Sequence, residues 1–475
     1  MPTKPCDGLE LTLSLAADHQ GVTAPAGITA LRTILRASAA PLIAAVAAQS
    51  AGNLVFHAAV GRLLPADDYG ALGAVLAAMV MLGIPLGALQ TSASALTAAD
   101  GVTTATLTRT IATVGRWAAL AGGGVLLATP VVRDYFRLES SMDAALLAPY
   151  LVVTAVLATA RGLLLGARRI TAVAATYLAG TVVRVGLGLG LVYGLGVDHG
   201  VGVRSALAAT LIGEVAALVI ALGCLIRTAT AAPTATPLRL GTVGRAAAAV
   251  TGLFLFSTVD LLLARHHLRG AASGGYIAAA TVAKTVLALP AAIMSAVFPR
   301  LVAAWSGPTS GPTSGARSAR RRAVALGAGI VVGPATLGAI VVIIAPGELL
   351  RLLYGDGYAS AAALVQALAG IAAATSLVTF ATYAALARRA ATLWLPWFGA
   401  LFEVVLIELR HGSAMQIAVG SATALLPTLA VIAVVEGRAW MAGGRAWPHW
   451  SARTAQFATG HADRDNDTTG QPPVR

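Results

Sequence analysis

The sequence contains few charged residues: only 11% of its 475 residues are Asp, Glu, Lys or Arg, whereas 57% are hydrophobic and the mean hydropathy is +0.78. These values lie far outside the range of soluble globular chains, so we exclude that class and predict a membrane protein. Several charge-free stretches are long enough for a spanning helix of about 20 apolar residues. The longest lie between Arg36 and Arg62, Asp68 and Asp100, Arg322 and Glu348, Asp356 and Arg388, and Arg410 and Glu436.

Cysteine is also scarce, and the motifs of several enzyme classes are missing. Cys6 lies in the N-terminal segment and Cys224 near the inner end of a predicted span, so we expect no structural disulfide. The sequence has no Walker motif, no metal-ligand cluster and no nucleophile triad. We therefore expect neither ATP hydrolysis nor enzymatic activity, and no cofactor or bound metal.

Acidic residues are fewer than basic ones, which leaves a formal net charge of +13. The arginines are dispersed over helix ends and form no stripe with interleaved aromatic residues, so we expect no nucleic acid partner. They collect at one set of loop ends, for example Arg168-Arg169 and Arg320 to Arg322. Because cytoplasmic loops are enriched in Lys and Arg, we predict a multi-pass plasma membrane protein with both termini in the cytoplasm and contacts to membrane lipids.

Hydrophobic segments predict about twelve spanning helices, and hence an all-α polytopic membrane protein. The predicted spans are 37–61, 71–98, 110–132, 144–166, 171–194, 203–226, 244–264, 275–303, 322–346, 359–386, 391–409 and 413–436. The predicted organisation is a cytoplasmic N-terminal tail (1–34), a first six-helix lobe (35–226), a cytoplasmic linker (227–242), a second six-helix lobe (243–436) and a cytoplasmic C-terminal tail (437–475). The Gly/Pro/Ser/Thr segment 306–315 is predicted to be a flexible cytoplasmic loop.

The two halves repeat one plan about the midpoint linker. Each half has an arginine, a Gly/Tyr pair and a proline that interrupts the next helix: Arg62, Tyr69-Gly70 and Pro85, then Arg265, Gly275-Tyr276 and Pro290. Because each half holds an even number of helices, the two lobes enter the membrane in the same sense, as in parallel transporter repeats. A solute path between the lobes is the natural inference.

Three segments carry a resemblance to a known family: RLLPADDYG, DLLLARHHLRGAASGGYIAAATVAKTVLALP with VFPR, and LLRLLYGDGYASAAALVQALAG. Over about residues 35–436 the chain resembles the polysaccharide-biosynthesis flippases of the multidrug/oligosaccharidyl-lipid/polysaccharide exporter superfamily, although Leu64 stands before Pro65 where the family often has glycine. The resemblance implies two six-helix lobes around a central cavity, alternating access and a lipid-linked oligosaccharide as cargo. It also implies glycan polymerases or glycosyltransferases as partners.

Other functions stay open at this point. Within the same superfamily they are a cation-coupled drug exporter and a peptidoglycan-precursor flippase, and in another class a polytopic membrane glycosyltransferase. The adjacent acids Asp67 and Asp68 bear on the last of these, because paired carboxylates could hold a divalent metal. The loop is short, however, and Asp67 stands directly before a predicted helix, so we expect it to cap exposed backbone N–H groups.

Charged residues inside spans indicate function more directly, because each costs about 2.5–3.5 kcal/mol at a helix centre on insertion scales. Arg184 and Lys284 are predicted near the middle of the membrane, where they would suit the pyrophosphate of a lipid-linked sugar. The alternative is that Arg184 pairs with Glu214 and Lys284 with Asp260. Asp260, Glu214 and Glu403 are in turn candidates for coupling to a proton or another cation, since buried carboxylates often carry protons during transport.

A polar stripe follows the first span. Gln49, Asn53 and His57 recur at every fourth position and so lie along one helix face. We consider them candidates for hydrogen bonds to sugar hydroxyls in the cavity, with interhelical hydrogen bonding as the alternative. Gln366, Thr375 and Thr379 on a later span have the same two interpretations.

Overall fold

The computed structural model describes residues 40–195, 201–231, 244–287, 290, 293–294, 314–388 and 390–441. The described residues from Pro41 onward belong to one compact unit. Several predictions lie outside the described residues: the N-terminal tail, most of the linker, most of the loop 306–315, the second half of the span at 275–303, and the C-terminal tail beyond Met441.

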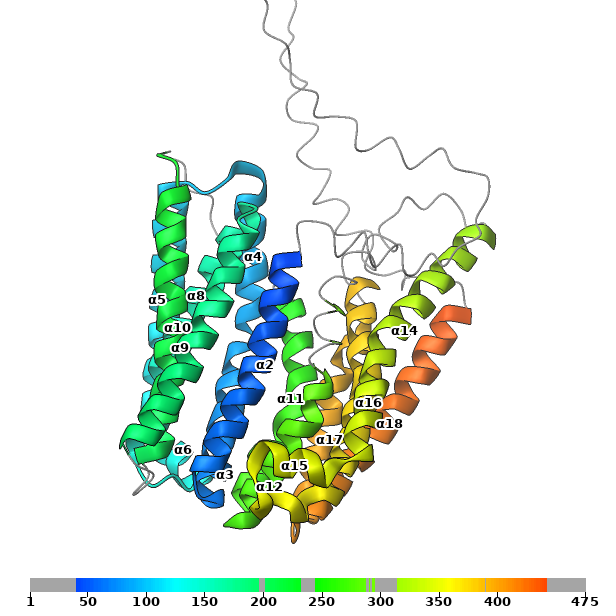
Figure 1. Cartoon of the computed structure of the whole chain (residues 1–475). Coiled ribbons are helices and arrows are strands. Elements are labelled where there is room, and N and C mark those ends of the chain that lie inside the picture. Colours follow the sequence, from blue (N-terminus) through cyan, green and yellow to red (C-terminus); the bar gives the residue numbers. More distant parts are fainter. Residues whose placement is uncertain are drawn as a thin grey trace, which may run out of the picture. The chain divides into compact units, whose positions relative to one another are not determined.

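The first lobe is built from α-helices (Figure 1). They are α2 (Ala40–Leu63), α3 (Ala66–Gly83), α4 (Leu86–Asp100), α5 (Thr104–Leu127), α6 (Thr129–Phe136), α7 (Ser141–Ala145), α8 (Leu147–Gly166), α9 (Ile170–Leu195) and α10 (Val201–Thr228). The break between α3 and α4 falls at Ile84-Pro85, where the proline lacks the N–H that would continue the helix. The side chain of Thr103 accepts from Thr106 N at 3.0 Å and thereby caps α5.

The second lobe repeats this plan with short 3₁₀ segments added. Its elements are α11 (Gly244–His267), α12 (Ala271–Lys284), η2 (Thr285–Leu287), α14 (Ser314–Ile344), α15 (Pro346–Tyr354), η3 (Asp356–Ala361), α16 (Ala362–Arg388), η4 (Ala391–Trp394), α17 (Leu395–Leu409) and α18 (Ala414–Met441). The short helices α6 and α15 occupy the same place in the order of their lobes, directly after the long helices α5 and α14.

Eleven helical segments of the described chain are long and apolar enough to cross a membrane. They match eleven of the twelve predicted spans, and α12 begins the twelfth. The span predicted at 110–132 has the wrong bounds, because α5 starts at Thr104 and a separate helix begins at Thr129-Pro130. The described residues contain no strand beyond an isolated bridge between Thr103 and Thr230. The prediction of an all-α, multi-pass membrane protein with two lobes is confirmed.

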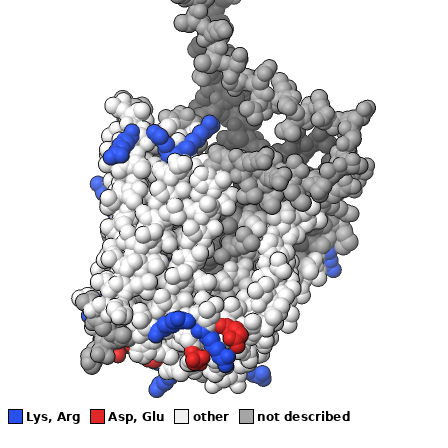
Figure 2. All heavy atoms as spheres, in the orientation of Figure 1, with Lys and Arg blue, Asp and Glu red and all other residues white. Residues whose placement is uncertain are grey.

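Exposed charged side chains gather at the two ends of the helical bundle. On the face shown in Figure 2, an uncharged band separates one end that carries Lys and Arg from an opposite end that carries both signs. Large apolar side chains stay exposed on the long helices, among them Trp117, Leu127, Tyr193 and Ile344. In the membrane these exposed side chains contact lipid tails, which provide the apolar surroundings that a protein core provides in a soluble protein. The end with both signs is the one that the arginine distribution predicts to be extracellular.

The lobes are joined where α3 packs against α11 and α12. We call this end of the bundle, at the bottom of Figure 1, the closed end. The largest cluster of buried apolar residues extends over both lobes here and includes Tyr69 and Leu72 of α3 with Tyr276 and Ile277 of α12.

Two glycines permit close helix approach, one between the lobes and one within a lobe. Gly274 of α12 lies so near Ala66 O of α3 that a Cβ there would collide with the backbone. Gly162 of α8 approaches Gln90 O of α4 in the same way, inside the first lobe. A side chain at Gly274 would therefore separate the lobes, whereas one at Gly162 would disturb the packing of a single lobe.

We predict different outcomes for Gly274→Val and Gly162→Val. The first should open the closed end, raising the rate at which a membrane-impermeant maleimide labels Ser273→Cys in a Cys6→Ser, Cys224→Ser background. The second should leave labelling unchanged and lower the free energy of unfolding in detergent by about 1–3 kcal/mol, the usual cost of overpacking. Equal losses of stability without faster labelling would mean that Gly274 is a packing position like any other.

Candidate functional site

An arginine of the second lobe is held by the first lobe at the closed end. Arg265, near the C-terminus of α11, is only 3% exposed, and its Nη1 lies 2.6 Å from Asp67 Oδ1 on α3. Its Nε donates to Phe136 O at 2.9 Å and its Nη2 to Arg137 O at 3.2 Å, where α6 ends. The buried guanidinium thus finds an anionic partner and carbonyl acceptors in the opposite lobe, which is what its burial requires.

A second arginine makes the reciprocal contact. Arg62, at the end of α2 in the first lobe, donates through Nε to Leu353 O at 2.9 Å and through Nη2 to Arg351 O at 3.2 Å and to Leu352 O. These carbonyls belong to the last turn of α15, where the helix dipole is negative and carbonyls lack helical partners. Each lobe therefore provides an arginine that binds carbonyls at the C-terminal end of the short helix of the other lobe, α15 or α6.

Asp67 does not play the role expected from the sequence. Helix α3 starts at Ala66, its N-cap is Pro65, and no side chain caps it by a hydrogen bond. Asp67 Oδ1 instead accepts from Gly270 N at 2.9 Å, just before α12, in addition to binding Arg265. The capping interpretation was wrong because both partners come from the other half of the chain.

Positive charge gathers around this contact. Burial, followed by the charges of Arg269 and Arg265, lowers the pKa of Arg137 from its ordinary value. Asp67 is half exposed, so water screens part of its attraction for these cations.

A buried aromatic cluster adds a second interlobe contact. Tyr69 of α3 donates its hydroxyl to that of Tyr354 at 3.1 Å, and its ring packs against the rings of Tyr354 and Tyr358. Tyr358 in turn donates to Gly61 O at 3.3 Å. His57 Nδ1 lies 3.1 Å from Tyr69 Oη, and the side chain is buried. This position favours the interhelical alternative for His57 over a contact with sugar hydroxyls.

Arg184 on α9 meets the polar stripe of α2. Its Nη1 donates to Asn53 Oδ1 at 2.9 Å, and its Cζ lies 4.2 Å from the centroid of the Phe56 ring. Its Nε is buried and has no hydrogen-bond partner. In the described part of the chain no carboxylate lies within ion-pair distance of Arg184, so the alternative in which Arg184 pairs with Glu214 is not observed. Arg184 is thus a cation with an unused donor.

The remaining residues of this half are less constrained. Gln49 is half-buried, one turn before Asn53 on α2, and Glu214 is half-buried on α10. Glu214 is close enough to Arg184 for electrostatic attraction without direct contact. We retain both as candidates.

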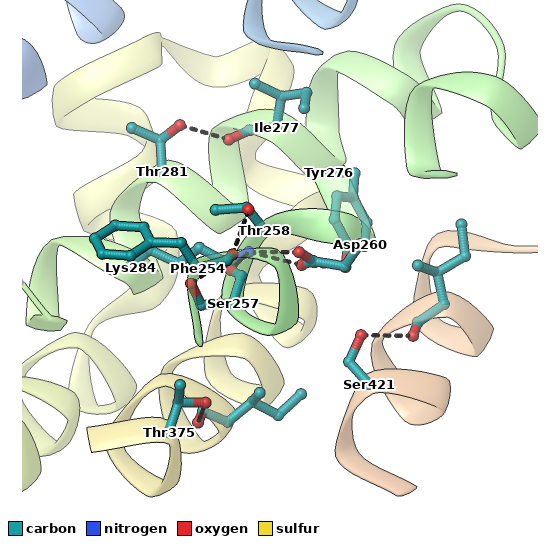
Figure 3. A network of polar contacts seen from close by, with 12 residues as sticks. Phe254, Ser257, Thr258, Asp260, Tyr276, Ile277, Thr281, Lys284, Thr375 and Ser421 are labelled. Atoms are coloured by element: carbon teal, nitrogen blue, oxygen red, sulfur yellow. Dashed lines mark hydrogen bonds and ion pairs between the residues drawn. The ribbon is translucent and has the colours of Figure 1, made fainter. Parts of the chain in front are cut away.

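In the second lobe the structure joins two predicted residues (Figure 3). Lys284 Nζ on α12 lies 2.6 Å from Asp260 Oδ1 and 2.9 Å from Oδ2, and it donates to Ser257 O at 2.7 Å. Tyr276 donates to Asp260 Oδ2 at 2.9 Å. The alternative in which Lys284 neutralises Asp260 therefore describes the geometry. Both side chains are committed to each other in this state of the protein.

Glu403 shares a small pocket with this pair. The pocket lies between α11, α12, α16, α17 and α18, and its polar lining is Ser257, Asp260, Lys284, Thr375, Glu403 and Ser421. Glu403 is 2% exposed, and its Oε2 has no hydrogen-bond partner. Two carboxyl groups thus face one ammonium group in apolar surroundings, and the ionised form of the second carboxyl is costly there.

Sequence reasoning singled out the buried charges but not the interlobe contacts. Arg62 and Arg265 were recognised as repeat markers, and Tyr69 as part of a turn motif, without a role. The sequence feature that could have indicated these contacts was the recurrence of an arginine in both halves, because Arg62 and Arg265 occupy matching positions in the two lobes.

Comparison with known proteins gives the fold a context. No known family profile and no curated protein sequence matches the chain. Among solved structures, a multidrug resistance MATE family transporter of the MOP superfamily in its inward-facing conformation has a TM-score of 0.60 and 15% identity, over 82% of this chain and 96% of its own. Its outward-facing conformation also gives 0.60 and 15%, over 90% and 100%.

A further match is a MOP superfamily transporter from Pyrococcus furiosus, described by the reverse polarity of its binding pocket, with a TM-score of 0.57, 16% identity and coverage of 90% and 100%. At these identities the likeness shows the fold alone. The chain has a two-lobe helical fold similar to that of the MATE transporters in these structures.

We predict that Asp67→Asn opens the closed end. Losing the charge of a half-exposed pair should cost about 1 kcal/mol, which raises the open population about fivefold. Hydrogen exchange of residues 270–276, measured by mass spectrometry, should accelerate accordingly. Asp68→Asn is the matched control, because the neighbouring acid has no ion pair in the described chain. Equal hydrogen exchange of residues 270–276 in the two variants would mean that Asp67 does not help to keep the closed end together.

Proposed function

We propose that this protein is a flippase that moves a polyprenyl-pyrophosphate-linked oligosaccharide from the inner to the outer leaflet of the plasma membrane by alternating access, for cell-surface polysaccharide synthesis. The lipid tail stays in the bilayer while the headgroup passes between the lobes. The proposal rests chiefly on Arg184, a guanidinium within a spanning helix that has no carboxylate partner in the described chain and an unused Nε donor.

An anionic headgroup supplies what Arg184 lacks. A guanidinium binds phosphate oxygens through parallel hydrogen bonds, and removing water from a cation is tolerable only when an anion replaces it. Asn53 fixes the orientation of the guanidinium, and Phe56 supports its face. Asn53 is itself exposed on α2 and, with Gln49, offers hydrogen bonds to sugar hydroxyls. The first lobe thus provides the headgroup site.

Alternating access follows from the contacts at the closed end. The two reciprocal arginine contacts and the tyrosine cluster hold the lobes together there, and opening requires all of them to exchange protein partners for water. Similar solved structures include both inward-facing and outward-facing conformations of one transporter family. A ligand biases such an equilibrium only through different affinities for the two states.

The pocket of the second lobe is suited to coupling. When Asp260 and Glu403 share one proton, a single negative charge balances Lys284; when both are ionised, the pocket carries a net negative charge. Proton uptake from the predicted extracellular side would therefore change the electrostatics between α11, α12 and α17. Those helices include α11, which carries Arg265 to the closed end.

A drug exporter is the second candidate, because one observation favours it. Several solved structures with this fold are multidrug resistance transporters, and the acid-rich pocket of the second lobe could accept a cationic compound. The substrate charge separates the candidates: Arg184 favours an anion and the pair Asp260 and Glu403 favours a cation. Nothing in the described structure favours the glycosyltransferase or distinguishes the peptidoglycan-precursor flippase.

Arg184→Gln should reduce translocation of lipid-linked oligosaccharide in proteoliposomes at least about tenfold, since a charge-assisted hydrogen bond contributes about 1.5–3 kcal/mol. Abundance in the membrane should stay near normal. Arg161→Gln is the matched control: this arginine also lies over an aromatic ring, Tyr177, and donates to Thr176 Oγ1 at 3.0 Å inside the lobe. Its loss should lower thermal stability more than the transport rate per folded molecule.

Two outcomes would argue against the flippase. If Arg184→Gln lowers abundance while the remaining protein transports normally, Arg184 is structural. If wild-type protein moves cationic drugs and ignores the lipid-linked sugar, the drug exporter replaces the flippase.

Asp260→Asn and Glu403→Gln should each abolish the response of transport to an imposed pH gradient while preserving substrate binding, because each fixes one carboxyl in a neutral form. The exposed acid Glu348, paired with Arg351 at 3.0 Å, provides the control variant Glu348→Gln. The measurement is translocation in proteoliposomes with and without the gradient. A full gradient response in both pocket variants would assign these acids to packing, and a wild type without any response would exclude proton coupling.

A further inference from the structure

A group of metal-ligating side chains lies at the closed end, apart from the sites described above. His267 is the last residue of α11, Glu408 lies in the last turn of α17, and His411 lies in the turn before α18. His267 Nε2 is 3.1 Å from Glu408 Oε1. One ligand atom from each of the three residues lies within 4.8 Å of those from the other two. The three side chains come from separate elements of one lobe and converge on one point.

The spacing of these atoms fits a small divalent ion. Zinc binds His nitrogen and carboxylate oxygen at about 2.0–2.2 Å, so two ligands of a tetrahedral ion lie about 3.3 Å apart. The observed 3.1 Å between His267 Nε2 and Glu408 Oε1 is close to this separation. The rings of His267 and His411 are stacked, with their centroids 3.9 Å apart and an interplanar angle of 19°, so one ring must rotate before both nitrogens can bind one ion.

The tautomer of His411 is set in the way that metal-binding histidines require. Its Nδ1 lies 3.0 Å from Glu408 O and 3.3 Å from Ile407 O. A carbonyl oxygen only accepts, so Nδ1 must carry the proton and Nε2 presents its lone pair. Histidines bound to metals commonly donate their other N–H to a backbone carbonyl in this manner. The tautomer of His411 that a metal ion requires is therefore favoured before any ion binds.

We propose that His267, Glu408 and His411 form a binding site for Zn²⁺ or a similar borderline divalent ion. Two imidazoles and one carboxylate favour zinc, copper or nickel over magnesium and calcium, which prefer oxygen ligands. Three protein ligands leave a fourth position for water. The site does not depend on the proposed transport function. The sequence spacing did not indicate it, because 141 residues separate His267 from Glu408.

Occupation of the site would tie the end of α11 to the α17–α18 turn. Arg265 lies two residues before His267 on α11, so the ion would fix the segment that carries the interlobe arginine. His266 is the neighbour that belongs elsewhere: its ring stacks on Tyr135 of the first lobe with centroids 4.3 Å apart, and its Nδ1 lies 3.1 Å from Tyr135 O. It offers a matched histidine outside the proposed site.

The test is calorimetric titration of Zn²⁺ into the purified full chain in detergent, with any affinity tag removed. The tail residues His449 and His461 are replaced by Gln in every sample. The reference protein should bind one Zn²⁺ per chain. His267→Gln, His411→Gln and Glu408→Gln should each weaken binding at least about tenfold, a loss that even changes around a metal site produce. His266→Gln should bind as the reference does.

A second measurement guards against misfolded variants. Without metal, all variants should unfold at the same temperature, and Zn²⁺ should raise that temperature only in the reference protein and His266→Gln, because a ligand stabilises the state that binds it. The proposal would be overturned if the reference protein did not bind Zn²⁺ at millimolar concentration. It would also be overturned if His267→Gln and His411→Gln bound Zn²⁺ as tightly as the reference protein does. Equal competition by Mg²⁺ would also overturn it, since an exposed carboxylate alone would then explain the binding.

Discussion

The arrangement of the lobes depends on how a buried guanidinium at the closed end is satisfied. Arg265 can be 3% exposed only because Asp67 and the carbonyls of Phe136 and Arg137 surround it, and all three belong to the other lobe. If the lobes part, every one of these partners is lost and water must replace them. In the proposed transport cycle the closed end would therefore have two conditions, one paired and dry and the other open and hydrated. Alternating access requires this kind of two-state element.

The two lobes divide the buried charge unequally. In the first lobe Arg184 is a cation without a described acid in contact, and in the second lobe Asp260 and Glu403 outnumber Lys284. Each imbalance is costly in a membrane and is reduced by a different ligand: an anion for the first lobe, a proton or cation for the second. In the proposed transport, binding of one ligand would alter the field between the lobes and hence the affinity for the other. The unequal division gives a physical reason for coupling that a symmetric pair of lobes would lack.

Local properties of this fold could be predicted from the sequence, and distant contacts could not. Spanning helices follow from runs of apolar residues, and the break at Pro85 follows from one missing N–H. Lys284 and Asp260 were paired as an alternative because their charges would neutralise one another, and they do so across neighbouring helices, 24 residues apart. Asp67 was assigned to a cap because it stands directly before a predicted helix, and its actual partner Arg265 lies 198 residues away. The alternative in which Arg184 pairs with Glu214 is not observed, and Asn53 and Phe56 contact the guanidinium instead.

The internal repeat explains why closure involves two arginines. Arg62 ends the first helix of its lobe and Arg265 stands near the end of the corresponding helix of the other lobe, and each binds the carbonyl end of the opposite short helix, α15 or α6. Each lobe carries one such arginine and one short helix whose end accepts hydrogen bonds. When the two lobes of the chain pack together, both contacts form. The acid breaks this symmetry: Asp67 follows Arg62 by five residues, whereas Gly270 follows Arg265 by the same interval and donates its N–H to Asp67. The contact of Arg62 therefore relies on helix carbonyls alone, whereas the contact of Arg265 adds an ion pair with Asp67. Because α11 carries both Arg265 and Asp260, a change in the charge of the second-lobe pocket can affect this ion pair through α11.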